Sequence, residues 1–164
     1  MKRVVSTAVV LFVSFFLYDA FAQSSTEDDI QIVQGAWGRQ KRELVSIAME
    51  LSAKDSARFW PVYDKYETAR KKLGRERLII LNDYVNSYET LTSTKADQLV
   101  NRLFKNDADN ARLLQQYYNS MKTALNALQA AKFVHIESFL QSYIKIHLQA
   151  NLPYIGELDK MKGQ

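Results

Sequence analysis

The side chains that most often carry metal or acid–base chemistry are few in this sequence. Its two histidines are His135 and His147, and it contains no cysteine. Metal ligands on one helix face stand three or four residues apart, whereas these histidines are several turns apart. Without a thiolate, a zinc site would need acidic partners or a second subunit. We therefore predict no bound metal, and keep metal sensing as a less favoured alternative.

Motifs of hydrolytic, phosphoryl-transfer and nucleophilic enzymes are also missing. The sequence has no G-x-S-x-G, no H-E-x-x-H, no phosphate-binding loop and no Cys–His pair. Asp107 and Asp109 are neighbours in a polar stretch, but they show no local acid–base arrangement. We predict that the protein is not an enzyme and needs no cofactor.

Cationic side chains gather in two short segments. Residues 69–77 hold five of them, and residues 39–42 hold three. If the helices that carry them are antiparallel neighbours, both segments share one surface that attracts acidic partners. The predicted binding residues are Arg39, Arg42, Arg70, Lys71, Lys72, Arg75 and Arg77. The alternative is a pair of ordinary solvated helix faces, with Glu67 and Lys71 paired four residues apart. The net charge of +4 is too small to indicate nucleic-acid binding.

These segments must be positioned by helices. Apolar residues recur every three or four positions, and no stretch alternates long enough to form a convincing strand. We expect an all-α fold of four long amphipathic helices in an elongated helical hairpin or bundle. The helices are expected from Asp28 or Asp29 to Leu51, from the Ser52 cap to about Glu89, from the Thr92 cap through Leu125, and from about Leu128 to Ala150, before Pro153. Positions predicted to face inward include Leu44, Ile47, Phe59, Tyr63, Tyr66, Phe133, Leu140 and Tyr143.

Two features interrupt the helical pattern. Pro61 lies inside the second helix, where its ring removes a backbone N–H and clashes with the preceding turn. Because the apolar stripe continues from Phe59 to Tyr88, we predict a rod kinked near Pro61 and not a break. The polar residues 105–110 interrupt the third stripe, and we predict that they form an exposed turn of one long helix.

The N-terminal residues indicate export. Lys2 and Arg3 precede an almost wholly apolar run, residues 4–17, and Ala-Phe-Ala ends at Ala22. This pattern is typical of a signal peptide, residues 1–22, cleaved near Ala22. The rival is an uncleaved anchor helix, but the run is shorter than the ~20 residues that span a bilayer. Residues 23–164 would then form a single all-helical domain in the periplasm. Having no disulfide, that domain depends on its core or on self-association.

Two of the expected helix starts have the same local pattern. LSAKD (residues 51–55) and LTSTK (residues 91–95) each place Leu before a hydroxyl cap, with a polar residue three positions after the cap. This pattern resembles the LTxxQ motif of the Spy/CpxP-like periplasmic proteins, although Asp55 and Lys95 stand where the motif has Gln. The segments FWPVYD and AAKFVHIE, residues 59–64 and 130–137, also resemble a related group of exported helical proteins. The similarity extends over residues 51–155.

The resemblance implies a fold and a function. Long helices would form a thin, hairpin-like layer, dimerised into a curved cradle whose basic concave face carries apolar patches. The implied function is that of a periplasmic, ATP-independent chaperone-like homodimer, whose partners are unfolded or partly folded proteins. The alternative is a sensor or adaptor that docks on one membrane-bound signalling protein during envelope stress. The family also contains metal sensors.

Overall fold

The computed structural model describes the backbone of residues 26–150 and 152, and the side-chain environments of residues 38–150 and 152. The predicted signal peptide, residues 1–22, lies outside the described residues, as does Pro153. The chain forms two compact units, Met1–Trp37 and Gly38–Gln164. All side-chain contacts that follow are within the second unit.

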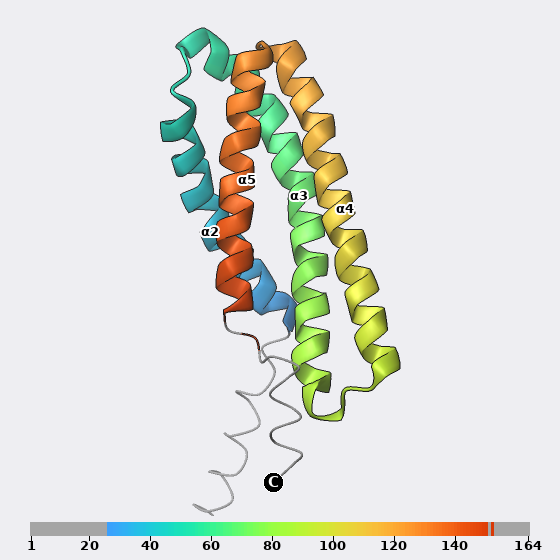
Figure 1. The fold of residues 1–164 in the computed structure, drawn as a ribbon. Helices are drawn as coiled ribbons and strands as arrows, with labels where there is room; N and C mark the ends of the chain where they lie inside the picture. The colour runs from blue at the N-terminus through green and yellow to red at the C-terminus, as the bar shows by residue number, and fades with distance from the viewer. Residues whose placement is uncertain (1–25, 151, 153–164) are drawn as a thin grey trace, which may run out of the picture. The chain divides into compact units, whose positions relative to one another are not determined.

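Helices make up almost all of the described chain (Figure 1). They are α2 (Thr26–Met49), α3 (Ala53–Ser87), the short 3₁₀ helix η2 (Tyr88–Thr90), α4 (Ser93–Ala124) and α5 (Ala127–Gln149). No strand occurs in the part of the chain that the structure describes, so the all-α prediction is confirmed. Among the same residues, no helix has the length and apolar character needed to cross a membrane.

Polar caps set the starts of three helices. Ser52, Thr92 and Asn126 each accept a hydrogen bond from the backbone N–H three residues further on, at 3.1, 3.2 and 2.9 Å. Each bond satisfies a donor that the first helical turn leaves without a partner. The caps at Ser52 and Thr92 confirm the predicted starts. The cap at Asn126 was not predicted, because it lacks the Leu–hydroxyl pattern of the other two.

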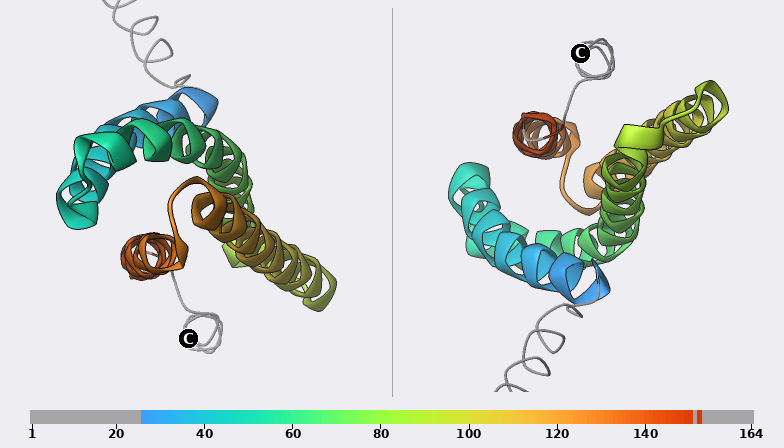
Figure 2. Two further views of the ribbon diagram at one scale, coloured as in Figure 1. Left: turned by 90° about the horizontal axis from the view of Figure 1, so that it is seen from above. Right: turned by 90° about the horizontal axis from the view of Figure 1, so that it is seen from below.

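Pro61 does not interrupt α3. The helix continues from Ala53 to Ser87 with Pro61 inside it, and the proline is exposed. The missing N–H leaves the carbonyl of Ala57 without its helical donor, but Ala57 is also on the exposed side, where water can reach it. Figures 1 and 2 show α3 as a curved rod. A long helix that passes through its proline agrees with the prediction.

The polar residues 105–110 are helical, as predicted, but they are not simply exposed. Asn106 is buried, and its Nδ2 donates a hydrogen bond of 2.8 Å to the carbonyl of Leu73 on α3. Asn110 in turn donates to the carbonyl of Asn106 at 2.9 Å. The expectation of a fully exposed turn is wrong, because this stretch of α4 faces α3 and uses an amide at the contact.

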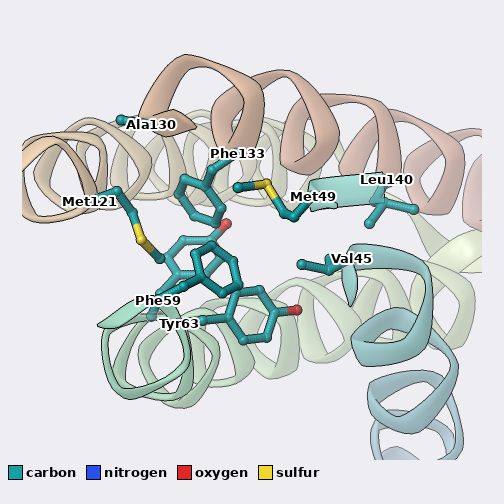
Figure 3. Close-up of a cluster of buried hydrophobic side chains, with 9 residues drawn as sticks. Val45, Met49, Phe59, Tyr63, Met121, Ala130, Phe133 and Leu140 are labelled. Carbon is teal, nitrogen blue, oxygen red and sulfur yellow. The ribbon is translucent and has the colours of Figure 1, made fainter. Parts of the chain in front are cut away.

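The helices of the second unit pack as consecutive antiparallel pairs. α3 and α4 lie side by side and are joined through η2, while α4 and α5 are joined by Leu125 and Asn126 (Figure 1). The core collects side chains from α2, α3, α4 and α5 (Figure 3). Its buried members are Val45, Met49, Phe59, Tyr63, Tyr66, Met121, Ala130, Phe133 and Leu140.

Aromatic rings at the centre of the core connect α5 to α3. The ring of Phe133 is edge-on to Phe59, Tyr63 and Tyr66, with centroids 6.2, 6.4 and 5.2 Å apart. Each such pair adds about 0.5–1.5 kcal/mol to the stabilisation from burial alone. The FWPVYD and AAKFVHIE segments therefore meet in the core.

Three predicted core positions are wrong. Leu44, Ile47 and Tyr143 were expected to face inward, and all three are exposed, Ile47 by 67%. On α2 the buried positions instead recur every four residues from Lys41 to Met49. This spacing places Leu44 and Ile47 on a different side of the helix.

Glu50 links α2 to α3 in a left-handed backbone conformation, with a φ of 49°. Lys132 of α5 donates to the carbonyl of Met49 at 3.1 Å and to the Glu50 carboxylate at 3.2 Å. The Met49 carbonyl at the end of α2 is therefore satisfied by a distant side chain. Only Gly adopts this φ without a steric penalty.

We predict that Glu50→Gly is more stable than Glu50→Ala by about 1 kcal/mol, because glycine removes the Cβ clash at positive φ. Both variants lose the same exposed ion pair to Lys132, so the difference between them isolates backbone strain. Urea unfolding followed by circular dichroism measures it. Equal stability of the two variants would show that Glu50 is not strained.

Candidate functional site

The predicted basic surface on α3 is divided between outward and inward positions. Arg70 is only 9% exposed. Its Nε and Nη2 donate to the two carboxylate oxygens of Glu67 at 3.0 and 2.7 Å. Arg70 follows Tyr63 and Tyr66 at helical spacing, so it continues the buried face of α3. Arg70 is therefore directed into the protein and not toward the surface on which it was predicted to contact a client.

Arg77 also lies mostly inside. Its Nη1 donates to Asp107 Oδ1 of α4 at 2.8 Å, and Lys145 of α5 donates to the same oxygen at 2.7 Å. The Nε–H of Arg77 is buried and has no hydrogen-bond partner among the described residues. Arg77 therefore belongs to a contact between three helices and not to an open basic face.

The remaining basic residues near this region face outward to different degrees. Arg39, Lys72 and Arg75 are exposed, whereas Lys71 is half-buried. A Cβ added at Gly38 on α2 would lie 3.5 Å from Lys71 Nζ, so the two residues are close neighbours. An exposed cationic surface thus persists, but with fewer residues than predicted.

Arg42 is held between an aromatic ring and an acid. Its guanidinium lies 4.1 Å from the ring centre of Trp60 and forms an ion pair with Asp64. Because Arg42 contacts Asp64 while Gly38 approaches Lys71, residues 38–49 of α2 run antiparallel to α3. The geometric condition for the two basic segments to adjoin is therefore met.

Four charged side chains meet inside the second unit, a cluster that we call the buried quartet: Lys41, Glu67, Arg70 and Glu137. Lys41 Nζ lies 2.8 Å from Glu67 Oε2 and 2.8 Å from Glu137 Oε2. Lys41 and Glu137 are fully buried. The two cations balance the two anions, as charges removed from water require. Sequence reasoning missed the quartet, although Glu137 stands between the buried positions Phe133 and Leu140 at helical spacing.

Tyrosine hydroxyls extend the buried quartet. Tyr66 donates to Glu137 Oε2 at 2.9 Å and accepts a hydrogen bond of 3.0 Å from Gln141. Lys41 Nζ lies 5.8 and 5.4 Å from the ring centres of Tyr63 and Tyr66. Glu137 Oε1 and the Tyr63 hydroxyl are buried without a partner among the described residues. The network joins α2, α3 and α5 through polar contacts that only one register satisfies.

Burial and the neighbouring charges together set the pKa values in this network. It lowers the pKa of Lys41 below its usual 10.5, against the opposing effect of Glu137. Burial alone would raise the pKa of Glu67, but the hydrogen bonds from Arg70 and the charge of Lys41 outweigh it, and the pKa falls to about 2. Burial also raises the pKa of both Tyr63 and Tyr66.

A lysine with a lowered pKa is a candidate nucleophile, but its surroundings argue against that role here. Lys41 is fully buried and donates to two carboxylates, so no substrate atom can approach it without opening the core. We assign the buried quartet to positioning α2 and α5 against α3.

The histidines lie apart from any metal-binding cluster. His135 is exposed, and His147 Nδ1 lies 2.9 Å from the carbonyl of Tyr143, whose ring it contacts. No group of three or more His, Asp or Glu side chains that could hold a metal occurs among the residues that the structure describes.

An exposed apolar row on α5 is the second surface feature. Leu128, Phe139 and Ile146 are 79, 66 and 64% exposed. They are separated by eleven and seven residues, close to three and two whole helical turns, so they lie on one side of α5. We call these three residues the α5 apolar stripe. The sequence did not reveal it because apolar residues occur on both the inward and the outward sides of this very apolar helix.

Comparison with protein-family models gives no match, and comparisons with curated proteins and with solved structures give none either. The resemblance to Spy/CpxP-like proteins therefore stays a prediction, based on the LSAKD and LTSTK helix starts.

We predict that the buried quartet makes stability depend on acid. Because folding lowers the pKa of Glu67 from 4.5 to about 2, its contribution is complete above pH 4.5 and is lost as the pH falls towards 2. The loss is on the order of 3 kcal/mol. Urea unfolding between pH 2 and 6 should show a shallower decline for Glu67→Gln than for wild type. Glu43→Gln, at an exposed position, is the control and should leave the slope unchanged.

We also predict strong coupling between Lys41 and Glu137. Lys41→Met leaves the Glu137 carboxylate buried without its cation and should cost about 3–5 kcal/mol. The double variant Lys41→Met/Glu137→Gln removes both charges and keeps an acceptor for Tyr66, so it should be more stable than Lys41→Met alone. A double-mutant cycle by denaturant unfolding measures the coupling, and additive effects would contradict it.

Proposed function

We propose that this protein is an exported, noncatalytic binding protein that holds unfolded or partly folded clients in a chaperone-like manner, without ATP. The observation that carries the proposal is the α5 apolar stripe. Exposed apolar patches mark interaction surfaces, and three large apolar side chains on one side of a helix are a candidate for such a surface.

The spacing of the α5 apolar stripe suits weak contact with an extended chain. Leu128 and Ile146 are separated by 18 residues of helix, roughly 27 Å at 1.5 Å per residue. Phe139 lies between them, so the stripe offers separate anchors and not one continuous pocket. Each anchor gains part of the ~1.5–3 kcal/mol that complete burial of such a side chain gives. Separate, partial contacts favour reversible binding of many sequences.

Positive charge on α2 and α3 would assist the encounter. Arg39, Lys72 and Arg75 are exposed, and the whole chain carries a net charge of +4. Such a surface speeds association with acidic segments, and salt reduces the effect. Arg70 and Arg77 take no part in this surface because they are directed inward.

Docking on one membrane-bound signalling protein is the second candidate. The contact of Arg42 with Trp60 favours it, because these residue types dominate the binding energy of many specific interfaces. The ion pair of Arg42 with Asp64 fixes the guanidinium in place before a partner arrives. A homodimer that covers the α5 apolar stripe is a related proposal.

The decisive test is suppression of aggregation of a chemically denatured client. Phe139→Ser/Ile146→Ser should raise the amount of protein needed for protection several-fold, because two anchors are lost. Phe104→Ser removes an equally exposed apolar side chain from α4 and is the matched control. Circular dichroism should show unchanged helicity in both variants. Equal protection by wild type and by Phe139→Ser/Ile146→Ser would show that the α5 apolar stripe is not the client site.

Two further measurements separate the alternatives. Arg39→Glu/Lys72→Glu should weaken protection at low salt and have little effect at high salt, since exposed charges are screened. Sedimentation of the wild type and of Phe139→Ser/Ile146→Ser shows whether the stripe joins two copies. Wild-type protein that gives no protection at any ratio, but binds one envelope protein saturably, would favour the docking role.

A further inference from the structure

A partly open apolar pocket of about 190 Å³ lies between α3, α4 and the C-terminal end of α5. Its walls include the buried side chains of Ile80, Leu81 and Leu99 and the half-buried Leu91 and Leu103. None of these residues belongs to the core cluster of Figure 3. The pocket is therefore an apolar part of the α3–α4 pair that the described residues do not close.

The chain itself reaches this pocket at the end of α5. The helix ends at Gln149, and both Gln149 and Leu152 line the pocket. The Leu152 N–H donates to the Gln149 carbonyl at 3.1 Å, which closes one tight turn after the helix. Leu152 is half-buried and is the last residue that the structure describes. The residues that follow it in the sequence therefore start from the wall of the pocket.

The sequence after Leu152 begins with large apolar side chains. It reads PYIGEL, residues 153–158. Pro153 has no N–H to continue a helix, and it disfavours a helical conformation of the residue before it. In an extended chain alternate side chains point to the same side, so Tyr154 shares the side of Leu152. Two Cα–Cα steps of about 3.8 Å keep the Tyr154 Cα within about 8 Å of the Leu152 Cα. An aromatic side chain is thus tethered beside an apolar pocket.

We propose that residues 153–158 of the same chain cover this pocket, with the ring of Tyr154 inserted between Leu81, Leu99 and Leu103. The size is suitable, because an apolar cavity of about 150 Å³ holds a benzene ring, and this pocket has about 190 Å³. The chemistry is suitable as well. A tyrosine buries its ring and keeps its hydroxyl hydrogen-bonded, and a partly open pocket lets that hydroxyl reach water.

A tethered segment has an advantage over any free ligand. A group joined to its site by a short flexible link acts at an effective concentration in the millimolar range. Since a single residue separates Tyr154 from Leu152, a free apolar peptide or small molecule would have to displace the tyrosine ring. For this reason residues 153–158, and not a client, are the occupant.

This contact would fasten the end of α5 to the hairpin of α3 and α4. Ile146 of the α5 apolar stripe is six residues before Leu152, so the same contact would also hold the proposed client-binding helix in place. The proposal goes beyond client binding, because it concerns a contact within the chain. The two ideas fail independently, since neither Phe139 nor Ile146 lines the pocket.

Disulfide trapping in the full chain tests the proposal, because the chain has no cysteine of its own. Val100 lines the pocket and is 40% exposed, so its replacement does not disturb the core. A disulfide needs Cα atoms within about 7 Å of each other. Under mild oxidation we expect Val100→Cys/Tyr154→Cys to form an intramolecular disulfide in at least tenfold higher yield than Gln98→Cys/Tyr154→Cys. Gln98 is the matched control, because it is exposed two residues away on nearly the opposite side of α4.

Thermal unfolding shows whether the ring of Tyr154 is buried and not merely nearby. Tyr154→Ser should lower the melting temperature by about 4 °C or more, because the buried ring is lost. Tyr154→Phe keeps the ring and should melt like wild type, as should Met161→Ser, which lies outside residues 153–158. Equal disulfide yields from the two cysteine pairs, disulfides that join only separate chains, or a Tyr154→Ser variant that melts like wild type would each overturn the proposal.

Discussion

The pairing of four charges away from water constrains the rest of this structure. Lys41 cannot leave the reach of Glu67 and Glu137 without leaving a charge buried and unpaired, a state far more costly than the loss of an exposed ion pair. Apolar packing is tolerant of small shifts, whereas these bonds of 2.8 Å are not. The buried quartet therefore selects one register of α2 and α5 against α3, and the aromatic rings around Phe133 fill the remaining space.

This arrangement decides which charges and which apolar groups are left for partners. The same face of α3 that delivers Phe59 and Tyr66 to the core also takes Arg70 and Arg77 inward, so the basic surface is smaller than the composition of residues 69–77 indicates. On α5, by contrast, apolar side chains remain at the surface. The helix buries Phe133 and Leu140 and still exposes the three residues of the α5 apolar stripe. A binding function without catalysis is consistent with both outcomes.

The two ends of the α3–α4 pair differ in how they are filled. Near Met121 aromatic side chains fill the core, whereas near Leu91 and Leu99 aliphatic side chains leave a partly open pocket of about 190 Å³ with Arg77 in its wall. The rings near Met121 come from α3 and α4 themselves, with Phe133 added by α5. Arg77 Nε, in a residue beside the pocket, and Glu137 Oε1, in the core, are both buried without a hydrogen-bond partner among the described residues.

Local sequence signals were enough to predict the helices, but they did not predict which side chains are buried and which are exposed. Capping at Ser52 and Thr92, the period of the apolar residues and the continuation of the pattern past Pro61 depend on neighbours within a few residues, so they could be predicted from the chain alone. The direction of Arg70, the burial of Asn106 and the exposure of Ile47 depend on which helix lies opposite, and periodicity does not contain that information. Lys41 and Glu137 are 96 residues apart in sequence, so only the folded chain could bring them within hydrogen-bonding distance. Burial then converts ordinary surface residue types into a paired internal cluster.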